Sequence, residues 1–495
     1  MIMTQERMIL KGQGQLDEMA MFVRQAAQDG RPIDEVERSL WQSLLALGHT
    51  MLSSYVAGVG PGDVGDTLRH EGRDLKRLET PHDRRYMSVF GELTISRYVY
   101  GTRETQKHEV VPTDALLGLP EGDFSHLLQE WDQSFCVQGS YEESRRTVER
   151  ILGLGQSVRS LEQMSVSMAS SVEAFQESRP KPPVAEEGSI LVLTADGKGV
   201  PMRRDAEWDP PAIRGRRKKG EKANKKRMAC VGGVYTIDPF VRTAQEVAEE
   251  VLRDARKADR PEPCHKQLRA ELTREIDGVE VNGKERIFSW FAEQLKLRNP
   301  QGRKNVVCVM DGERALWKML LTIIPGVVCI LDLFHVLERL WQAAHCFHPE
   351  GSEAAQAFVT DRLLRLLRGE VGYIVGGLKQ MATKQKVRGT RRAQLSAVIG
   401  YLERNRRFMR YDEYLAAGFP IGSGVAEGAC RHLVKDRMEL TGMRWRTPGA
   451  QAMLSLRAVY INGDWNVFHG HRIKEERRRL YPYLSLVRRK RKKAA

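Results

Sequence analysis

Three short apolar runs that each end in an aspartate constrain the fold of this chain more than any other feature. They are residues 189–196, 305–311 and 326–332, which end in Asp196, Asp311 and Asp332. Each run is rich in β-branched residues and is continuously apolar, which is typical of a strand buried on both faces of a parallel sheet. Ligands of open α/β sheets bind at the carboxyl ends of the strands. The sequence therefore predicts a carboxylate cluster that can hold divalent metal, and with it nuclease-like or phosphoryl-transfer chemistry.

Length and composition favour an ordinary globular protein. With 495 residues the chain is long enough for several domains with sizeable cores. Residues 1–15 contain no apolar signal-peptide core, and nowhere does the chain hold the roughly 18 consecutive apolar residues of a membrane helix. The seven cysteines form no CxxC pair, which favours free thiols over a disulfide framework or a zinc ribbon. We therefore expect a cytoplasmic protein with no membrane partner.

The positive charge of the chain is concentrated in two segments. Residues 214–227 hold nine Lys or Arg and one Glu, and residues 472–493 hold eleven Lys or Arg and two Glu, which together exceed the whole net charge of +15. A solvated loop and a solvated tail are the alternative, but next to a carboxylate cluster such segments favour a DNA backbone as partner. The protein is then expected in the nucleoid. The predicted DNA-binding residues of the first segment are Arg214, Arg216, Arg217, Lys218, Lys219, Lys222, Lys225, Lys226 and Arg227.

The N-terminal part is predicted to be mainly helical and to carry DNA-binding elements. Residues 1–120 form a helical region with a β-hairpin within 86–100, where aromatic and β-branched residues flank Gly91. Residues 121–178 form a trihelical unit with helix-turn-helix spacing, either for DNA or as a unit that binds nothing. In this unit Ser140 and Glu143 have capping-box spacing. The proline-containing residues 179–188 are the predicted linker.

The rest of the chain is predicted to be an α/β domain with a helical insertion. Its first part is residues 189–344, in which 228–237 returns as a strand of the same sheet. Residues 345–418 are Leu- and Arg-rich and predict an all-helical insertion, and residues 419–465 complete the domain. Residues 466–495 are the basic C-terminal tail. The expected fold class is a mixed sheet flanked by helices.

Two aspartates and one glutamate are the best metal-ligand candidates. Asp196 and Asp311 are each followed by glycine, which lets the backbone turn sharply and leaves the carboxylate uncovered, although an Asp-Gly turn is also a common way to end a strand. Glu427 falls in the first turn of a predicted helix, 424–438, with Ser423 as N-cap. Spacing of four places the cations Arg431 and Lys435 on its face, for phosphate or for a surface ion pair.

Asp332 and His335 are more ambiguous. Asp332 either joins the cluster or caps the helix that begins after it. His335 lies off the apolar stripe of that helix and faces solvent or a cleft, where it could orient a phosphate or protonate a leaving oxygen.

With these residues in place, the chain resembles the bacterial insertion-sequence transposases of the ISKra group, which are related to Mutator-like elements. The resemblance covers roughly residues 85–465. It rests on ordered motifs at residues 112–119, 194–200, 309–313, 332–335, 422–428 and 442–445. Relatives often carry cysteines after the first hairpin, whereas residues 98–103 have none, which argues against a zinc module there.

The resemblance implies an RNase H-like catalytic domain and DNA transposase activity. It implies an Asp-Asp-Glu triad of Asp196, Asp311 and Glu427 that holds two Mg²⁺ ions, with Mn²⁺ as the alternative ion, and it strengthens a role for Asp332 and His335. The partners would be the double-stranded terminal inverted repeats and the target DNA. A homodimer is expected because two element ends must be paired. The rival hypotheses are a non-enzymatic DNA-binding regulator or inactivated relative, and a structure-selective nuclease.

Overall fold

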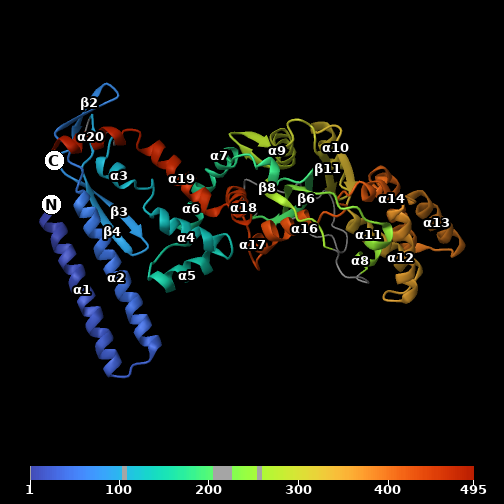
Figure 1. Ribbon diagram of the computed structural model, residues 1–495, viewed down its shortest axis with the longest axis horizontal. Helices are drawn as coiled ribbons and strands as arrows, with labels where there is room; N and C mark the ends of the chain where they lie inside the picture. Colours follow the sequence, from blue (N-terminus) through green and yellow to red (C-terminus); the bar gives the residue numbers. More distant parts are fainter. Residues whose placement is uncertain (1, 103–108, 204–225, 253–258, 495) are drawn as a thin grey trace. The chain divides into compact units, whose positions relative to one another are not determined.

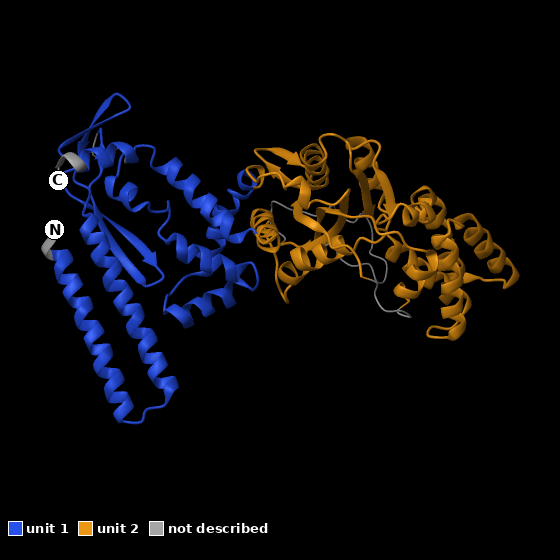
Figure 2. Ribbon diagram, in the orientation of Figure 1, with its two compact units in different colours: residues 1–175, 464–495 blue, residues 176–463 orange. Residues whose placement is uncertain are grey.

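The computed structural model describes residues 2–102, 109–203, 226–252 and 259–494, and its elements are labelled in Figure 1. The chain divides into two compact units, coloured separately in Figure 2. Unit 1 comprises residues 1–175 with 464–495, and unit 2 comprises residues 176–463. In the described part of the chain, no helix combines the length and the apolar character that crossing a bilayer requires.

Unit 1 is mainly helical and contains two small antiparallel sheets. Its first two helices lie side by side as a long hairpin (Figure 1). The helices are α1 (Ile2–Gln28), α2 (Ile33–Val59), α3 (Pro112–Leu117), α4 (His126–Cys136), α5 (Tyr141–Leu152), α6 (Val158–Ala169), α19 (Trp465–Leu480) and α20 (Leu484–Ala494), with α7 (Val172–Glu177) at the boundary. The strands are β1 (Thr67–His70), β2 (Arg73–Arg77), β3 (His82–Ser88), β4 (Gly91–Arg97) and β5 (Tyr100–Gly101), in the sheets β1-β2-β5 and β3-β4.

Two local predictions for unit 1 are confirmed. The hairpin expected around Gly91 is the antiparallel pair β3 and β4, in which Ser88 faces Gly91. The capping box of α5 is present, because Ser140 Oγ accepts from Glu143 N and a Glu143 carboxylate oxygen accepts from Ser140 N at 3.0 Å. Three successive helices, α4 to α6, occupy the predicted trihelical region.

The C-terminal region differs from the basic tail that was predicted. The described residues 466–494 form most of α19, a short connection and α20. The side chains of Tyr481, Tyr483 and Val487 are buried in a small core of unit 1. These apolar residues between the arginine clusters were overlooked because the charge density dominates the local composition. The C-terminal segment therefore packs against the rest of unit 1 through its apolar residues and is not a solvated tail.

Asp132 gives unit 1 a testable pH dependence. It is 1% exposed in α4, Gln156 Nε2 donates to its Oδ1 at 3.1 Å, and Oδ2 has no hydrogen-bond partner among the described atoms. Burial raises the pKa of this carboxyl to about 7. Between about pH 4 and pH 7, Asp132 is therefore protonated in the folded protein but ionised in the unfolded chain. The free energy of unfolding falls as the pH rises through this range.

Replacing Asp132 with asparagine should therefore stabilise unit 1 at pH 8. The change removes the cost of a buried charge but leaves a buried amide N–H without an acceptor, so we expect a gain of about 1–2 kcal/mol. At pH 4 the gain should vanish, because the folded wild-type carboxyl is then neutral. Thermal unfolding of both proteins at the two pH values measures this difference. A variant less stable than the wild type at pH 8 would contradict it.

Unit 2 is built on one mixed five-stranded sheet in the order β12-β11-β6-β7-β8. The strands β6, β11 and β12 run parallel, and β7 and β8 are each antiparallel to their predecessor. These strands are β6 (Ile190–Pro201), β7 (Lys226–Ile237), β8 (Cys264–Leu272), β11 (Asn305–Met310) and β12 (Val328–Leu331). Leu193, Cys308 and Ile330 are fully buried, so the continuous apolar runs were correctly predicted as buried parallel strands. The strand predicted at 228–237 is confirmed as part of β7.

Helices flank this sheet and also form the stretch predicted as an insertion. Residues 345–418 contain only the end of α11 and helical elements from α12 onward, and α12, α13 and α14 pack together (Figure 1). Tyr411 and Tyr414 of α15 join this stretch to β12, because their hydroxyls donate to Leu331 O at 2.7 Å and to Cys329 O at 3.0 Å. The remaining elements are η1 (Val184–Glu186), α8 (Ala244–Val251), β9 (Arg274–Ile276), β10 (Val279–Val281), α9 (Gly283–Arg298), α10 (Arg314–Ile323), α11 (Leu333–Phe347), α12 (Glu353–Leu367), α13 (Val371–Lys384), α14 (Gly389–Asn405), η2 (Arg406–Phe408), α15 (Tyr411–Ala416), α16 (Gly424–Ala429), the π-helix η3 (Cys430–Lys435), α17 (Asp436–Met438) and α18 (Thr447–Ile461).

The end of the predicted linker, residues 179–188, is anchored instead of free. The side chain of Glu187 is fully buried, and its Oε1 accepts from Arg298 Nε of α9 at 2.5 Å. Lys304 Nζ pairs with the other oxygen of the same carboxylate. The prolines earlier in the segment suggested an open connection, but a charged anchor cannot be recognised without its distant partners.

Candidate functional site

The strand register brings the three aspartates to one edge of the sheet. Ala195 of β6 is paired with Met310 of β11, which in turn is paired with Leu331 of β12. Asp196, Asp311 and Asp332 are the next residues of these three parallel strands. Because adjacent strands lie about 4.8 Å apart, their carboxylates gather at the carboxyl edge, as the sequence predicted.

Asp196 and Asp311 are partly exposed, and both accept hydrogen bonds. Asp196 Oδ1 accepts from the backbone N–H of Gly197 at 2.6 Å. Asp196 Oδ2 accepts from the thiol of Cys430 at 3.2 Å, and Asp311 Oδ1 accepts from the backbone N–H of Glu313 at 2.9 Å. Burial raises the pKa of the Asp311 carboxyl, and the charge of Asp196 adds to the effect. The negative charge of Asp196 beside the Asp311 carboxyl favours a cation nearby.

The predicted turns after these two acids need correction. β6 does not end at Asp196 but continues to Pro201 in its antiparallel pairing with β7, so Gly197 lies within a strand. Gly312 does follow the end of β11, and a Cβ atom there would lie 2.5 Å from Cε2 of Tyr401 on α14. Glycine at position 312 thus leaves room for the Tyr401 ring of the helical insertion. This contact could not be predicted from the sequence, because the two residues are far apart in the chain.

Asp332 is fully buried and its oxygens are already occupied. Oδ1 accepts from Phe334 N at 2.7 Å, which makes Asp332 the N-cap of α11. Oδ2 accepts from the backbone N–H of Ser423 at 3.0 Å and from the Ser423 hydroxyl. The capping alternative is therefore correct. The same carboxylate also ties the strand edge to the segment that leads into α16.

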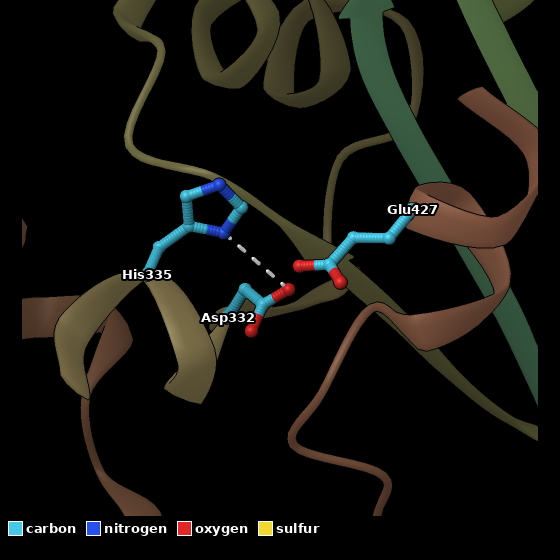
Figure 3. A group of neighbouring side chains, drawn as sticks. All are labelled: Asp332, His335 and Glu427. Carbon is cyan, nitrogen blue, oxygen red and sulfur yellow. Dashed lines mark ion pairs between the residues drawn. The ribbon is translucent and has the colours of Figure 1, made fainter. Parts of the chain in front are cut away.

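Glu427 reaches the same edge from α16, beside Asp332 and His335 (Figure 3). Among the described residues, these three are the only group of at least three His, Cys, Asp or Glu whose ligand atoms all lie within 4.8 Å of one another. His335 Nδ1 lies 3.5 Å from Asp332 Oδ2, and this carboxylate raises the pKa of His335 to about 9 against the effect of burial. At neutral pH the ring is therefore a cation between two carboxylates.

The compact group differs from the predicted ligand set of Asp196, Asp311 and Glu427. The structure places the first two on neighbouring strands and Glu427 beside Asp332 and His335. Burial raises the pKa of Glu427, and the charges of Asp332 and, more weakly, Asp196 add to this effect. Asp332 is the least available for metal because three donors occupy it, whereas Glu427 is exposed.

The helix that carries Glu427 is less regular than predicted. The expected helix 424–438 consists of α16, a π-helical segment and the short α17. Ser423 makes no side-chain cap, since its hydroxyl donates to Asp332. The wider π-helical turns interrupt the spacing of four on which the stripe of Arg431 and Lys435 depended. Arg431 instead lies 3.8 Å from Asp436, while both cations are exposed.

Most of the first basic segment lies outside the described residues. This applies to Arg214, Arg216, Arg217, Lys218, Lys219, Lys222 and Lys225. Lys226 and Arg227 are described and have protein partners, since Lys226 Nζ lies 2.6 Å from Glu439 Oε1 and Arg227 donates to Thr447 Oγ1 at 3.3 Å. These contacts reduce the freedom of both side chains to follow a phosphate backbone.

One cavity of unit 2 is lined by sequence neighbours of the clustered acids and not by the acids themselves. A cavity of about 620 Å³ in unit 2 has Phe334, Gly422 and Val425 in its wall, and none of the clustered acids is among its described lining. A small molecule held there would not contact the carboxylates.

The thiol of Cys430 and the hydroxyl of Ser423 were not predicted as partners of Asp196 and Asp332. Their spacing of i, i+4 and i+7 with Glu427 is a helical period that could have pointed to them. The sequence matches no model of a known protein family, and a comparison with curated proteins found no match. Function therefore has to be inferred from the site itself.

Proposed function

We propose that this protein is a DNA transposase of the Asp-Asp-Glu type. The observation that carries the proposal is the strand register, which sets Asp196 and Asp311 side by side at the carboxyl edge while α16 brings Glu427 to the same edge. The resemblance to ISKra-group transposases selects the same three residues. Unit 2 would then be an RNase H-like domain. Its mixed sheet flanked by helices and its helical stretch between Asp332 and Glu427 support this assignment.

The residues at the edge fit a hard divalent cation. Carboxylate oxygens are preferred ligands of Mg²⁺ and Mn²⁺. Burial, with smaller contributions from neighbouring carboxylates, raises the pKa of Asp311 and of Glu427, and a bound cation would favour the charged form of both. We infer that Asp196, Asp311 and Glu427 hold two such ions. When bound, the ions would activate the attacking oxygen and stabilise the leaving oxygen of an in-line phosphoryl transfer.

The other residues of the site would position the ligands and the DNA. Asp332 fixes the loop before α16 through its contact with Ser423, and this contact determines the position of Glu427 on that helix. The protonated ring of His335 would contact a phosphate oxygen or give its proton to the leaving oxygen. Water would attack at the element end to free a 3′-hydroxyl, which would then attack target DNA.

DNA binding would depend mainly on the basic segments and the trihelical region. The residues between Arg214 and Arg227, with Arg431, Lys435 and the basic C-terminal helices, would contact phosphates, and α4 to α6 would recognise terminal repeats. Phosphate contacts make affinity fall steeply with salt. Two chains would act together because two element ends must be joined.

A cleavage and joining assay on the DNA that flanks the coding region tests the proposal. With Mg²⁺ the purified chain should nick the element ends and join the new 3′-hydroxyls to a target duplex. Binding without cleavage would favour a regulator or an inactivated relative. Cleaved strands that are never joined would favour a structure-selective nuclease.

A further inference from the structure

One stripe of the α16 region contacts the acids of two different strands. Ser423, Glu427 and Cys430 follow each other at i, i+4 and i+7, which places them on one face of a helix. Ser423 donates to Asp332 through both its backbone N–H and its hydroxyl. Cys430 donates its thiol proton to Asp196 Oδ2 at 3.2 Å. Glu427 lies between these two donors.

We propose that Ser423 and Cys430 are positioning residues for the catalytic acids, a proposal that rests on the proposed function. Each donor fixes one strand-edge carboxylate, and together they fix the helix that presents Glu427. The residues that hold the acids in place therefore belong to the same helical stripe as the third acid. Displacing this stripe would disturb Asp196, Asp332 and Glu427 at once.

The surroundings of Cys430 suit a donor and leave Asp196 free to bind metal. The residue is 5% exposed, and a thiol carries its proton at neutral pH, so the S–H group can donate to Asp196. Each carboxylate oxygen has two lone pairs; the thiol uses one on Oδ2, and the backbone N–H of Gly197 uses one on Oδ1. Asp196 can therefore keep this contact while another lone pair faces a cation. Groups that orient a metal ligand in this way typically change metal affinity 10–100-fold when removed.

The position of Cys430 at the start of the π-helix supports the same role. Single π-helical turns are rare and often occur at functional sites. Here the wide turn begins at Cys430, directly after α16 and at the residue whose thiol contacts Asp196. A regular α-helix would place the following residues in a different phase. The irregular turn is consistent with a constraint on where Cys430 points.

Metal binding by the full-length protein separates a positioning role from simple packing. We would titrate Mn²⁺ and follow the free ion by electron paramagnetic resonance, without DNA. Cys430→Ala should weaken binding by about tenfold, whereas Cys430→Ser, which keeps a donor, should stay within about threefold of the wild type. Cys346→Ala is the matched control, because this buried thiol donates to the carbonyls of Gln342 and Arg391, away from the acids. It should bind Mn²⁺ like the wild type.

A second pair of variants tests the other donor. Ser423→Ala should slow Mg²⁺-dependent cleavage by about tenfold, and Ser423→Thr should restore most of the rate because it retains the hydroxyl. Equal Mn²⁺ binding by wild type and Cys430→Ala, or equal losses in Cys430→Ala and Cys430→Ser, would overturn the positioning role. Asp196→Asn distinguishes the two levels of the hypothesis. If this variant loses Mn²⁺ while Cys430→Ala does not, only the positioning role fails, and if it binds Mn²⁺ normally, the proposed function fails too.

Discussion

Asp311→Asn is expected to reduce metal-dependent strand cleavage at least about 10³-fold, equivalent to about 4 kcal/mol of transition-state stabilisation. Asparagine has nearly the same shape but no negative charge, so it cannot replace a carboxylate ligand of Mg²⁺. DNA binding should remain almost unchanged, because the basic segments that would contact the DNA do not include Asp311. Cleavage of labelled element ends and a mobility-shift titration measure the two properties on the same preparation.

The Asp311 variant should also remain folded, which makes a loss of activity informative. Burial already disfavours the charged form of this carboxyl, so a neutral amide should not destabilise unit 2. Asp361→Asn is a suitable control, since this exposed carboxylate of α12 pairs with Arg365 on the surface. The control should cleave like the wild type. Full Mg²⁺-dependent cleavage by Asp311→Asn would remove Asp311 from the proposed metal site.

The parallel strands and the edge where the acids meet could be predicted because both depend on local patterns. A continuous β-branched run identifies a buried strand, and its last residue marks the carboxyl end. Asp196, Asp311 and Asp332 could therefore be predicted to lie together, and the pairing of Ala195 with Met310 confirms the first two as neighbours. The capping box of α5 was predictable for the same reason, since Ser140 and Glu143 contact each other within one turn.

The partners of each acid could not be predicted because they come from distant parts of the chain. Ser423 reaches Asp332 across 91 positions, and Cys430 reaches Asp196 across 234. The sequence suggested a side-chain cap for Ser423, since a serine before a helix usually bonds the helix itself. Here the Ser423 hydroxyl donates to the buried Asp332 carboxylate instead, because a hydrogen bond to a carboxylate is stronger than one to a neutral backbone group. The π-helical turn after α16 likewise depends on packing and has no pattern in the local sequence.

Glu187→Gln is expected to lower the free energy of unfolding of unit 2 by about 3–5 kcal/mol, the usual cost of breaking one side of a buried ion pair. The side chains of Glu187 and Arg298 are both fully buried, and Lys304 shares the same carboxylate. Removing the negative charge leaves two cations without their counter-ion in a low-dielectric interior. Hydrogen exchange of β6, which begins three residues later, measures the change within unit 2.

Glu186→Gln provides the matched control for this change. Glu186 is the preceding residue, its side chain is 62% exposed, and it lies 3.3 Å from His265, so its loss should cost no more than about 1 kcal/mol. A triple variant, Glu187→Leu with Arg298→Met and Lys304→Met, should recover much of the stability lost in Glu187→Gln, because apolar side chains need no counter-ion. Protection of β6 that is equally reduced in both single variants would show that the segment contributes only surface contacts. A much larger loss of β6 protection in Glu187→Gln than in Glu186→Gln would show that the chain is fixed at Glu187, shortly before the strand that carries Asp196.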